Sequence, residues 1–179
     1  MPENTPQWYA LYTRSRHEGV VHKGLEENGF EVFLPLVERI RKWKDRKKKV
    51  KFPLFPGYLF VRVALEHETM IKILQQVGVV RFLGIKPLEP MPISESEIEY
   101  LKKLVTGSYE IDPYPFLKEG IRVRVKHGAL AGLEGFLVKK TAKHLLVISV
   151  DVLREGVALT IDASDIEAIG ETSNKTNDH

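Results

Sequence analysis

A stretch without periodic patterning divides this chain into two parts of different character. Residues 107–118 carry two prolines and a glycine and follow neither a helical nor a strand repeat, which predicts a flexible, extended linker. Strand-like and helix-like segments alternate before it, whereas only strand-like runs follow it. We therefore expect an α+β protein of two domains, over residues 1–106 and 119–170, with a disordered polar tail over residues 171–179.

The first domain has the pattern of an α/β sandwich built on an antiparallel sheet. Two Ser-x-x-Glu sequences, which begin at Ser15 and Ser94, predict capping boxes that start helices. A third helical face includes Met70 and ends at Gly78. Apolar and aromatic runs predict strands over residues 8–13, 30–35, 58–63 and 79–83.

The second domain has the pattern of a small five-stranded β-barrel. Within about fifty residues, strand-like runs occupy residues 121–126, 136–140, 145–150, 157–161 and 166–169. The turn between the first two runs contains three glycines that predict positive φ angles, Gly128, Gly132 and Gly135. Leu130 at the tip of this turn and Phe136 just after it are the residues that we predict to contact a partner.

The net charge of +3 is unevenly distributed. Residues 39–51 hold nine basic side chains and one acid, so this segment contributes +8 and the rest of the chain sums to −5. Its centre, Lys44 to Arg46, predicts the turn of a hairpin. A charge run is often only a solvated surface, but Trp43 among so many cations favours contact with phosphates and stacking on an unpaired base. The predicted nucleic-acid contacts on this arm are Arg46, Lys47, Lys48 and Lys49.

Aromatic side chains gather around a proline-rich turn. Between Lys51 and Arg62, four aromatic residues surround Pro53, Pro56 and Gly57, and an aromatic strand over residues 8–12 lies some forty residues upstream. Two interpretations remain open: these rings build the core of the first domain, or some of them line an exposed apolar pocket that receives a partner helix. The pocket interpretation gains some support from the two prolines, which place the segment at a sheet edge or turn.

The starts of two predicted helices carry groups suited to anions. Arg14, Arg16 and His17 open the first helix, and His67 and Thr69 open the second. Surface polarity and helix capping are the alternative interpretation. There are no cysteines, and we find no metal-ligand spacing, nucleotide-binding glycine loop or nucleophile with a base, so we expect no metal, no cofactor and no enzymatic activity. The absence of a signal region or a long apolar run predicts a soluble cytoplasmic protein without membrane contact.

Three motifs together resemble the NusG family of transcription elongation factors. They are Trp8-Tyr9-x-Leu11-Tyr12, the run from Leu54 to Val61, and the glycine turn at residues 128–135. The resemblance covers most of the chain, from Trp8 to about Ile169. It implies an NGN domain, a flexible linker and a KOW domain folded as an SH3-like barrel.

The resemblance also implies partners for particular residues. An NGN domain docks on the clamp helices of the largest RNA polymerase subunit and suppresses pausing. The residues that would contact the polymerase are Trp8, Tyr9, Tyr12, Phe55, Pro56 and Tyr58. Rho or a small-subunit ribosomal protein would bind the C-terminal barrel.

Within the family, the sequence is more similar to the RfaH-like antitermination factors than to the housekeeping member. The similar motifs are Leu11-Tyr12-x-Arg14, the run from Leu54 to Phe60 and His67-x-Thr69. That similarity implies contact of Arg14, Arg16 and His17 with the non-template DNA strand, and of His67 and Thr69 with the polymerase gate loop. Glu68 departs from the hydroxyl-rich pattern of that second contact, and Ala129 and Leu130 stand where many members have proline and phenylalanine. β-branched residues in the second half favour a barrel over a helical form.

We expect the protein to be a monomer. Two alternative functions also fit the sequence. The first is a housekeeping factor that promotes termination through Rho. The second is a ribosome-associated or general RNA-binding module, since barrels of this kind also occur in ribosomal proteins.

Overall fold

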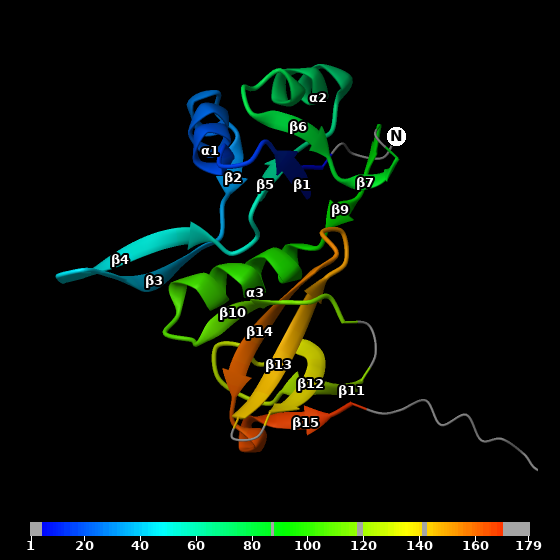
Figure 1. The fold of residues 1–179 in the computed structure, drawn as a ribbon. Coiled ribbons are helices and arrows are strands. Elements are labelled where there is room, and N and C mark those ends of the chain that lie inside the picture. Colours follow the sequence, from blue (N-terminus) through cyan, green and yellow to red (C-terminus); the bar gives the residue numbers. More distant parts are fainter. Residues whose placement is uncertain (1–4, 87, 118–119, 141–142, 170–179) are drawn as a thin grey trace, which may run out of the picture. The chain divides into compact units, whose positions relative to one another are not determined.

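The computed structural model describes residues 5–86, 88–117, 120–140 and 143–169 (Figure 1). The chain forms two compact units, the first made mainly by residues before Tyr109 and the second mainly by residues from Tyr109 on. The tail predicted over residues 171–179 lies outside the described residues. No helix among the described residues is long and apolar enough to cross a membrane.

The first unit is built on a five-stranded antiparallel sheet. Its strands are β1 (Gln7–Thr13), β2 (Glu31–Phe33), β5 (Tyr58–Val63), β6 (Val79–Phe82) and β9 (Pro92–Ile93). The strand order is β2-β5-β1-β6, and β9 pairs with the N-terminal end of β1, beside β6. The predicted antiparallel sheet is therefore confirmed, with β1 at its centre.

Helices cover both faces of this sheet. They are α1 (Glu18–Glu27), α2 (His67–Leu74) and α3 (Glu95–Thr106) (Figure 1). Alternate residues of a strand point to opposite faces. Tyr9 and Leu11 therefore pack with α1 and α2 in the main core, while Trp8 on the other face contacts α3. Burial on two sides explains why β1 is apolar along most of its length.

Only one of the two predicted capping boxes forms. Ser94 accepts a hydrogen bond from the Glu97 amide at 3.3 Å, and the Glu97 carboxylate accepts from the Ser94 amide at 3.1 Å. The prediction at Ser15 is wrong, because α1 begins three residues later with His17 as its N-cap and without a side-chain cap. The Glu18 carboxylate instead accepts a hydrogen bond from the backbone of Gly57.

Two short hairpins complete the first unit. The basic arm forms a two-stranded sheet of β3 (Leu36–Trp43) and β4 (Arg46–Pro53), which extends away from the main sheet (Figure 1). Trp43 pairs with Arg46, so the hairpin turns at Lys44 and Asp45 as predicted. β7 (Gly84–Lys86) and β8 (Glu89–Pro90) form the second, smaller hairpin.

The second unit contains a six-stranded antiparallel sheet in the order β10-β14-β13-β12-β11-β15. The five predicted strands are confirmed as β11 (Ile121–Val125), β12 (Glu134–Lys140), β13 (Lys143–Val150), β14 (Glu155–Ile161) and β15 (Ile166–Ala168), with a 3-10 helix, η1 (Ala163–Asp165), before the last. The sixth strand, β10 (Ile111–Tyr114), revises the predicted linker. Its residues pair with β14, so part of that segment belongs to the sheet.

The glycines of the β11–β12 turn have two different roles. Gly128 and Gly132 adopt positive φ angles of 85° and 87°, as predicted. Gly135 does not adopt a positive φ angle, so the prediction of a positive φ at this position is wrong. A Cβ atom on Gly135 would lie 2.5 Å from the Val147 carbonyl oxygen, so this position needs glycine for the close approach of β13.

Candidate functional site

The most exposed aromatic cluster of the sheet lies at the C-terminal end of β1. Tyr12 pairs across the strands with Tyr58 on one side and with Arg81 on the other, so all three side chains share one face. The two tyrosine ring centroids are 5.4 Å apart, and the Arg81 guanidinium lies 5.8 Å from the centre of the Tyr12 ring. Tyr12 is 38% exposed and Arg81 is exposed. We call this group the Tyr12 surface.

The turn that contains Gly57 holds the Tyr12 surface in place. Gly57 has a φ of 85°, and its carbonyl oxygen accepts hydrogen bonds from the Thr13 amide at 2.8 Å and the Thr13 hydroxyl at 3.3 Å. Its amide donates to the buried Glu18 carboxylate at 2.7 Å. A charged acceptor makes the stronger kind of hydrogen bond. The turn is therefore tied to both β1 and α1.

The predicted anion-binding residues follow β1 in the adjoining loop. The Arg14 amide donates to the Gly78 carbonyl at 2.8 Å, and the Arg16 backbone adopts a left-handed φ of 61°. His17 Nδ1 lies 2.9 Å from the Ser15 carbonyl oxygen. Arg14 and Arg16 are exposed, and His17 is half-buried. The structure therefore brings this predicted group next to the end of β1 that carries Tyr12.

Three residues predicted to line an open pocket are buried instead. Trp8 is 1% exposed, Tyr9 6% and Phe55 2%, so the interpretation of an accessible recess is wrong for them and the core interpretation is right. Lys102 of α3 covers the Trp8 ring at 4.9 Å, and Phe55 packs edge-on against Phe60. On the opposite face, Tyr9 packs edge-on against Phe82, and its burial raises the pKa of its hydroxyl. These rings therefore belong to the core of the first unit.

The remaining predicted polymerase contacts lie in two places. Pro56 is exposed and adjoins Gly57 in the turn beside Tyr12. His67 and Thr69 lie at the start of α2, which covers the opposite face of the sheet from Tyr12. His67 is exposed, and Thr69 lines a cavity of about 530 Å³ together with side chains from the ends of α1 and α2. The structure therefore does not join them to the Tyr12 surface.

The predicted nucleic-acid residues of the hairpin are all exposed, and so is Trp43 at 73%. The pairing of β3 with β4 divides them between two faces, because side chains alternate along a strand. Arg46 and Lys48 share one face, and Lys47 and Lys49 lie on the other. Lys49 forms an ion pair with Glu38 across the hairpin, with 3.7 Å between Lys49 Nζ and Glu38 Oε2. The four cations are thus not equivalent.

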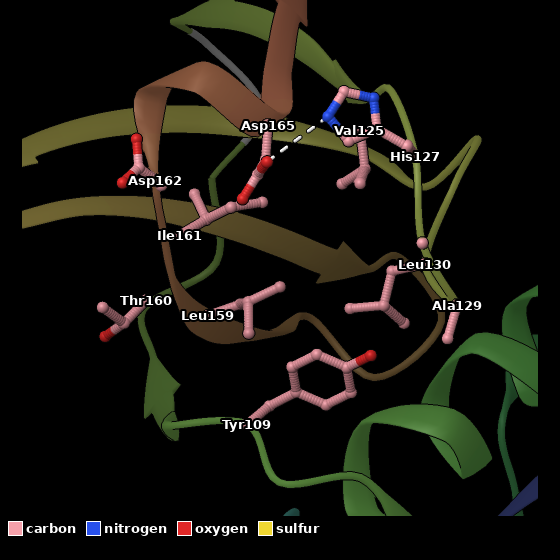
Figure 2. Close-up of a pocket in the computed structure, with 11 residues that line it drawn as sticks. Tyr109, Val125, His127, Ala129, Leu130, Leu159, Thr160, Ile161, Asp162 and Asp165 are labelled. Carbon is pink, nitrogen blue, oxygen red and sulfur yellow. Dashed lines mark ion pairs between the residues drawn. The ribbon is translucent and has the colours of Figure 1, made fainter.

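The second unit contains a cavity of about 360 Å³ beside the glycine turn (Figure 2). Tyr109, Leu130 and Leu159 line it, and His127 Nε2 lies 3.4 Å from Asp165 Oδ1 across its rim. Asp162, also on the rim, accepts a hydrogen bond from the Ser164 amide, which lowers the pKa of the aspartate.

The two residues predicted to contact a C-terminal partner do not share one exposed patch. Leu130 is 4% exposed and lines the cavity, and its contact with a partner remains a prediction. Phe136 is half-buried on β12, next to Gly120. Among the described residues, no three metal-ligating side chains gather into a group that could hold an ion.

Sequence reasoning missed Arg81 in the first unit and the acidic rim of Asp162 and Asp165 in the second. Arg81 reaches Tyr12 only because β6 pairs with β1, and strand order is not readable from a local pattern. The rim forms where the end of β14 and η1 meet the β11–β12 turn. A search for charged residues at strand ends would have found the two aspartates but not their neighbours.

The first unit thus combines a sheet, helices on both of its faces and a basic hairpin, and the second unit is built mainly of strands. Residues 6–102, more than half of the chain, match the family model described as "Transcription termination factor nusG". The chain belongs to the NusG family, which confirms the resemblance of its motifs.

Two bacterial proteins that share one NusG name align with almost the whole chain. "Transcription termination/antitermination protein NusG" of Helicobacter pylori is 28% identical over 173 residues, which cover 90% of this chain and 98% of the relative. The protein of the same name from Staphylococcus carnosus is 27% identical over 175 residues, covering 91% and 96%. A solved structure described as "Domain interaction in Thermotoga maritima NusG" has a TM-score of 0.57 and 21% identity, and covers 93% of this chain and 98% of that one. This last likeness supports the fold.

Proposed function

We propose that this NusG-family protein is a transcription elongation and antitermination factor that binds RNA polymerase through its first unit. The observation that carries the proposal is the family match over residues 6–102, which spans the Tyr12 surface and the basic hairpin together. The two relatives described above are named termination/antitermination proteins. The RfaH-like specialisation, with an antitermination outcome, remains our prediction from the sequence motifs.

The Tyr12 surface is our candidate for the contact with the clamp helices of the largest polymerase subunit. Tyrosine and arginine are the side chains that most often carry the binding energy of an interface. The hydrogen bonds of Gly57 fix the surface before binding, which lowers the entropic cost of association. Pro56 extends the surface, whereas Trp8, Tyr9 and Phe55 are buried in the core of the first unit and would not contact the polymerase directly.

Nucleic acid would be held on the same unit. Arg14, Arg16 and His17 adjoin the Tyr12 surface, and an exposed cation there suits the phosphates of the non-template strand. A protein that holds polymerase and DNA through one unit can bridge the cleft and suppress pausing. His67 and Thr69, on the opposite face of the sheet, remain our candidates for the gate loop.

The second unit would bind a further partner, either a small-subunit ribosomal protein or Rho. Its six strands fit a KOW-type barrel, and the cavity beside the glycine turn offers an apolar floor with an acidic rim. The names of the relatives include both termination and antitermination. Whether this protein raises or lowers termination is therefore measured by the read-through assay described below.

Retention on purified core RNA polymerase tests the polymerase contact. Replacing Tyr12 and Tyr58 together by alanine should weaken retention by about thirtyfold, the effect of losing about 2 kcal/mol of interface energy. The matched control replaces Ile85 and Leu88, which are 79% and 76% exposed, and should leave retention unchanged. Equal retention of both variants would favour the RNA-binding alternative.

A terminator read-through assay tests the outcome. Wild-type protein should raise read-through at intrinsic and Rho-dependent terminators under our proposal. Lower read-through that appears only when Rho is present would identify the housekeeping type of factor instead.

A further inference from the structure

The register of the basic hairpin sorts its side chains into two faces of different chemistry. Cross-strand partners share a face, and the pairs Arg41–Lys48 and Lys42–Lys47 are neighbours that point to opposite sides. One face, the arginine face, carries Val37, Arg39, Arg41, Trp43, Arg46, Lys48, Val50 and Phe52. The other, the lysine face, carries Leu36, Glu38, Ile40, Lys42, Lys47, Lys49, Lys51 and Pro53.

Two side-chain contacts agree with this division. The Arg41 guanidinium lies 5.0 Å from the centre of the Phe52 ring, and both residues belong to the arginine face. Lys49 and Glu38, which form an ion pair, both belong to the lysine face. Arg41 is thereby held by an aromatic ring at the base of its face, while a carboxylate partly neutralises the other face.

The two faces carry equal numbers of cations but differ in their acidic and aromatic side chains. Each face holds four cations. The arginine face has no acidic side chain and ends in Trp43, which is 73% exposed. The lysine face contains Glu38, and its exposed apolar residue is Ile40, which has no ring. The number of cations therefore cannot distinguish the faces, whereas arginine, tryptophan and the acid Glu38 can.

Arginine and tryptophan together fit an unpaired nucleic-acid strand. A guanidinium binds phosphate through two parallel donors, and an indole stacks on the face of any base. Alternate residues of a strand lie about 6.8 Å apart, so they can follow successive groups along a backbone. A base inside a duplex is already stacked on both sides, which leaves Trp43 without a partner there.

We propose that the arginine face binds an unpaired nucleic-acid strand, with Trp43 stacked on a base and Arg41, Arg46 and Lys48 on the flanking phosphates. The proposal deepens, and rests on, the nucleic-acid contact in the proposed function. The arginine face carries no hydroxyl or amide side chain that could bond a 2′-hydroxyl. Its proposed contacts are with phosphates and a base face, which DNA and RNA share, so it binds DNA and RNA strands of the same sequence about equally.

Tryptophan fluorescence of the full-length protein measures this contact directly. The chain has two tryptophans, and Trp8 is buried, so quenching by an added oligonucleotide reports on Trp43. A single strand of about 12 nucleotides, within the footprint of such surfaces, should quench the emission, and the matching duplex should bind at least about tenfold more weakly. DNA and RNA single strands should agree within about threefold. Equal binding of the duplex, or a tenfold preference for one sugar, would overturn the proposal.

Matched substitutions on the two faces separate the arginine face from diffuse charge. Arg41→Gln with Lys48→Gln removes two charges from the arginine face, and Lys42→Gln with Lys47→Gln removes two from the neighbouring pair on the lysine face. The first variant should reduce the salt slope of single-strand binding by about 1.4, and the second by less than about 0.5. Equal reductions would mean that the hairpin attracts polyanions without using one face.

A second pair of variants tests stacking. Trp43→Ala should weaken single-strand binding about five- to a hundredfold, while Ile40→Ala, at an exposed apolar position on the other face, should leave it unchanged. Binding of these two variants is followed by fluorescence anisotropy of a labelled strand, and their urea unfolding midpoints should match the wild type because both side chains are exposed. Unchanged binding by Trp43→Ala would exclude the stacking contact. Polymerase retention is a separate readout, so a failure of the Tyr12 surface is distinguishable from a failure here.

Discussion

Gly57 is the residue on which the geometry of the Tyr12 surface most depends. Its positive φ, its two hydrogen-bonding groups and its contact with the Tyr12 ring all act at one position. A Cβ atom there would lie 3.2 Å from Cε2 of Tyr12. Any side chain at position 57 therefore strains the backbone and presses on the ring.

We predict that Gly57→Ala lowers the free energy of unfolding by about 1–3 kcal/mol, because alanine tolerates this backbone conformation poorly. Urea denaturation measures the change. Gly19→Ala is the matched control, since a Cβ atom on Gly19 in α1 meets no atom within 4 Å. That control should stabilise the protein by about 0.5–1 kcal/mol. A Gly57→Ala variant as stable as the wild type would contradict our account of the turn.

For single residues, the sequence could indicate that an aromatic side chain matters, but not whether another element of the fold covers it. Trp8 and Tyr12 both lie on the same face of β1, yet α3 covers one and leaves the other partly exposed. Coverage depends on where a distant helix packs, which no local pattern encodes. The burial of Leu130 could not be predicted for the same reason, because Leu130 lines a cavity with Tyr109 and Leu159, which are distant in the sequence.

At the scale of elements, the two Ser-x-x-Glu motifs show how tertiary contacts override a local signal. The motif at Ser94 forms its capping box, whereas Glu18 of the first motif is drawn to the Gly57 amide and α1 begins later. The strands of the second unit were predictable because their apolar runs are short and bounded by turns. β10 was not, since Pro113 within it and Pro115 just after it resemble the prolines of a linker.

This difference predicts unequal effects of two identical substitutions. Ser94→Ala should cost about 1 kcal/mol of stability, because the Glu97 amide loses its acceptor. Ser15→Ala should cost less than about 0.5 kcal/mol, since Ser15 is exposed and caps no helix. Urea midpoints of the two variants compare them directly. Equal losses would show that the first capping box forms in solution.

The pair of strands β11 and β12 is joined by a charge cluster that should respond to pH. Glu134 accepts hydrogen bonds from Arg124 at 2.6 Å and 3.0 Å and from Arg122 at 2.8 Å. The Arg124 bond is the main cause that holds the pKa of Glu134 below its ordinary value. A carboxylate whose pKa is lowered by folding stabilises the protein above its unfolded pKa and loses that effect as the pH falls through the folded pKa.

We therefore predict that Glu134→Gln lowers the melting temperature at neutral pH, and that the difference from the wild type shrinks as the pH falls below the ordinary carboxylate range. The effect should be small, because the cluster is partly exposed and screened by salt. Melting curves across the acid range measure it. Glu167→Gln is the control, since Glu167 lies 4.0 Å from Arg124 in a looser contact. A difference that persists unchanged at low pH would contradict this role of the carboxylate.

At the scale of the whole molecule, the motifs were sufficient for the family, and the two-part layout followed from composition alone. The strand order was needed to find the candidate site, because it places Arg81 beside Tyr12. The Tyr12 surface, the Arg14 loop and the basic hairpin all belong to the first unit. In our proposal, the first unit therefore binds both polymerase and nucleic acid.

Site-specific photo-crosslinking to a purified elongation complex tests the central claim most directly. A photoreactive amino acid in place of Tyr12 should crosslink to the largest polymerase subunit, and one in place of Ile85, which is 79% exposed and lies in the small β7–β8 hairpin, should not. A crosslink confined to the Tyr12 position is the predicted result. Absence of polymerase from the Tyr12 crosslinks, or equal yields from both positions, would contradict the account.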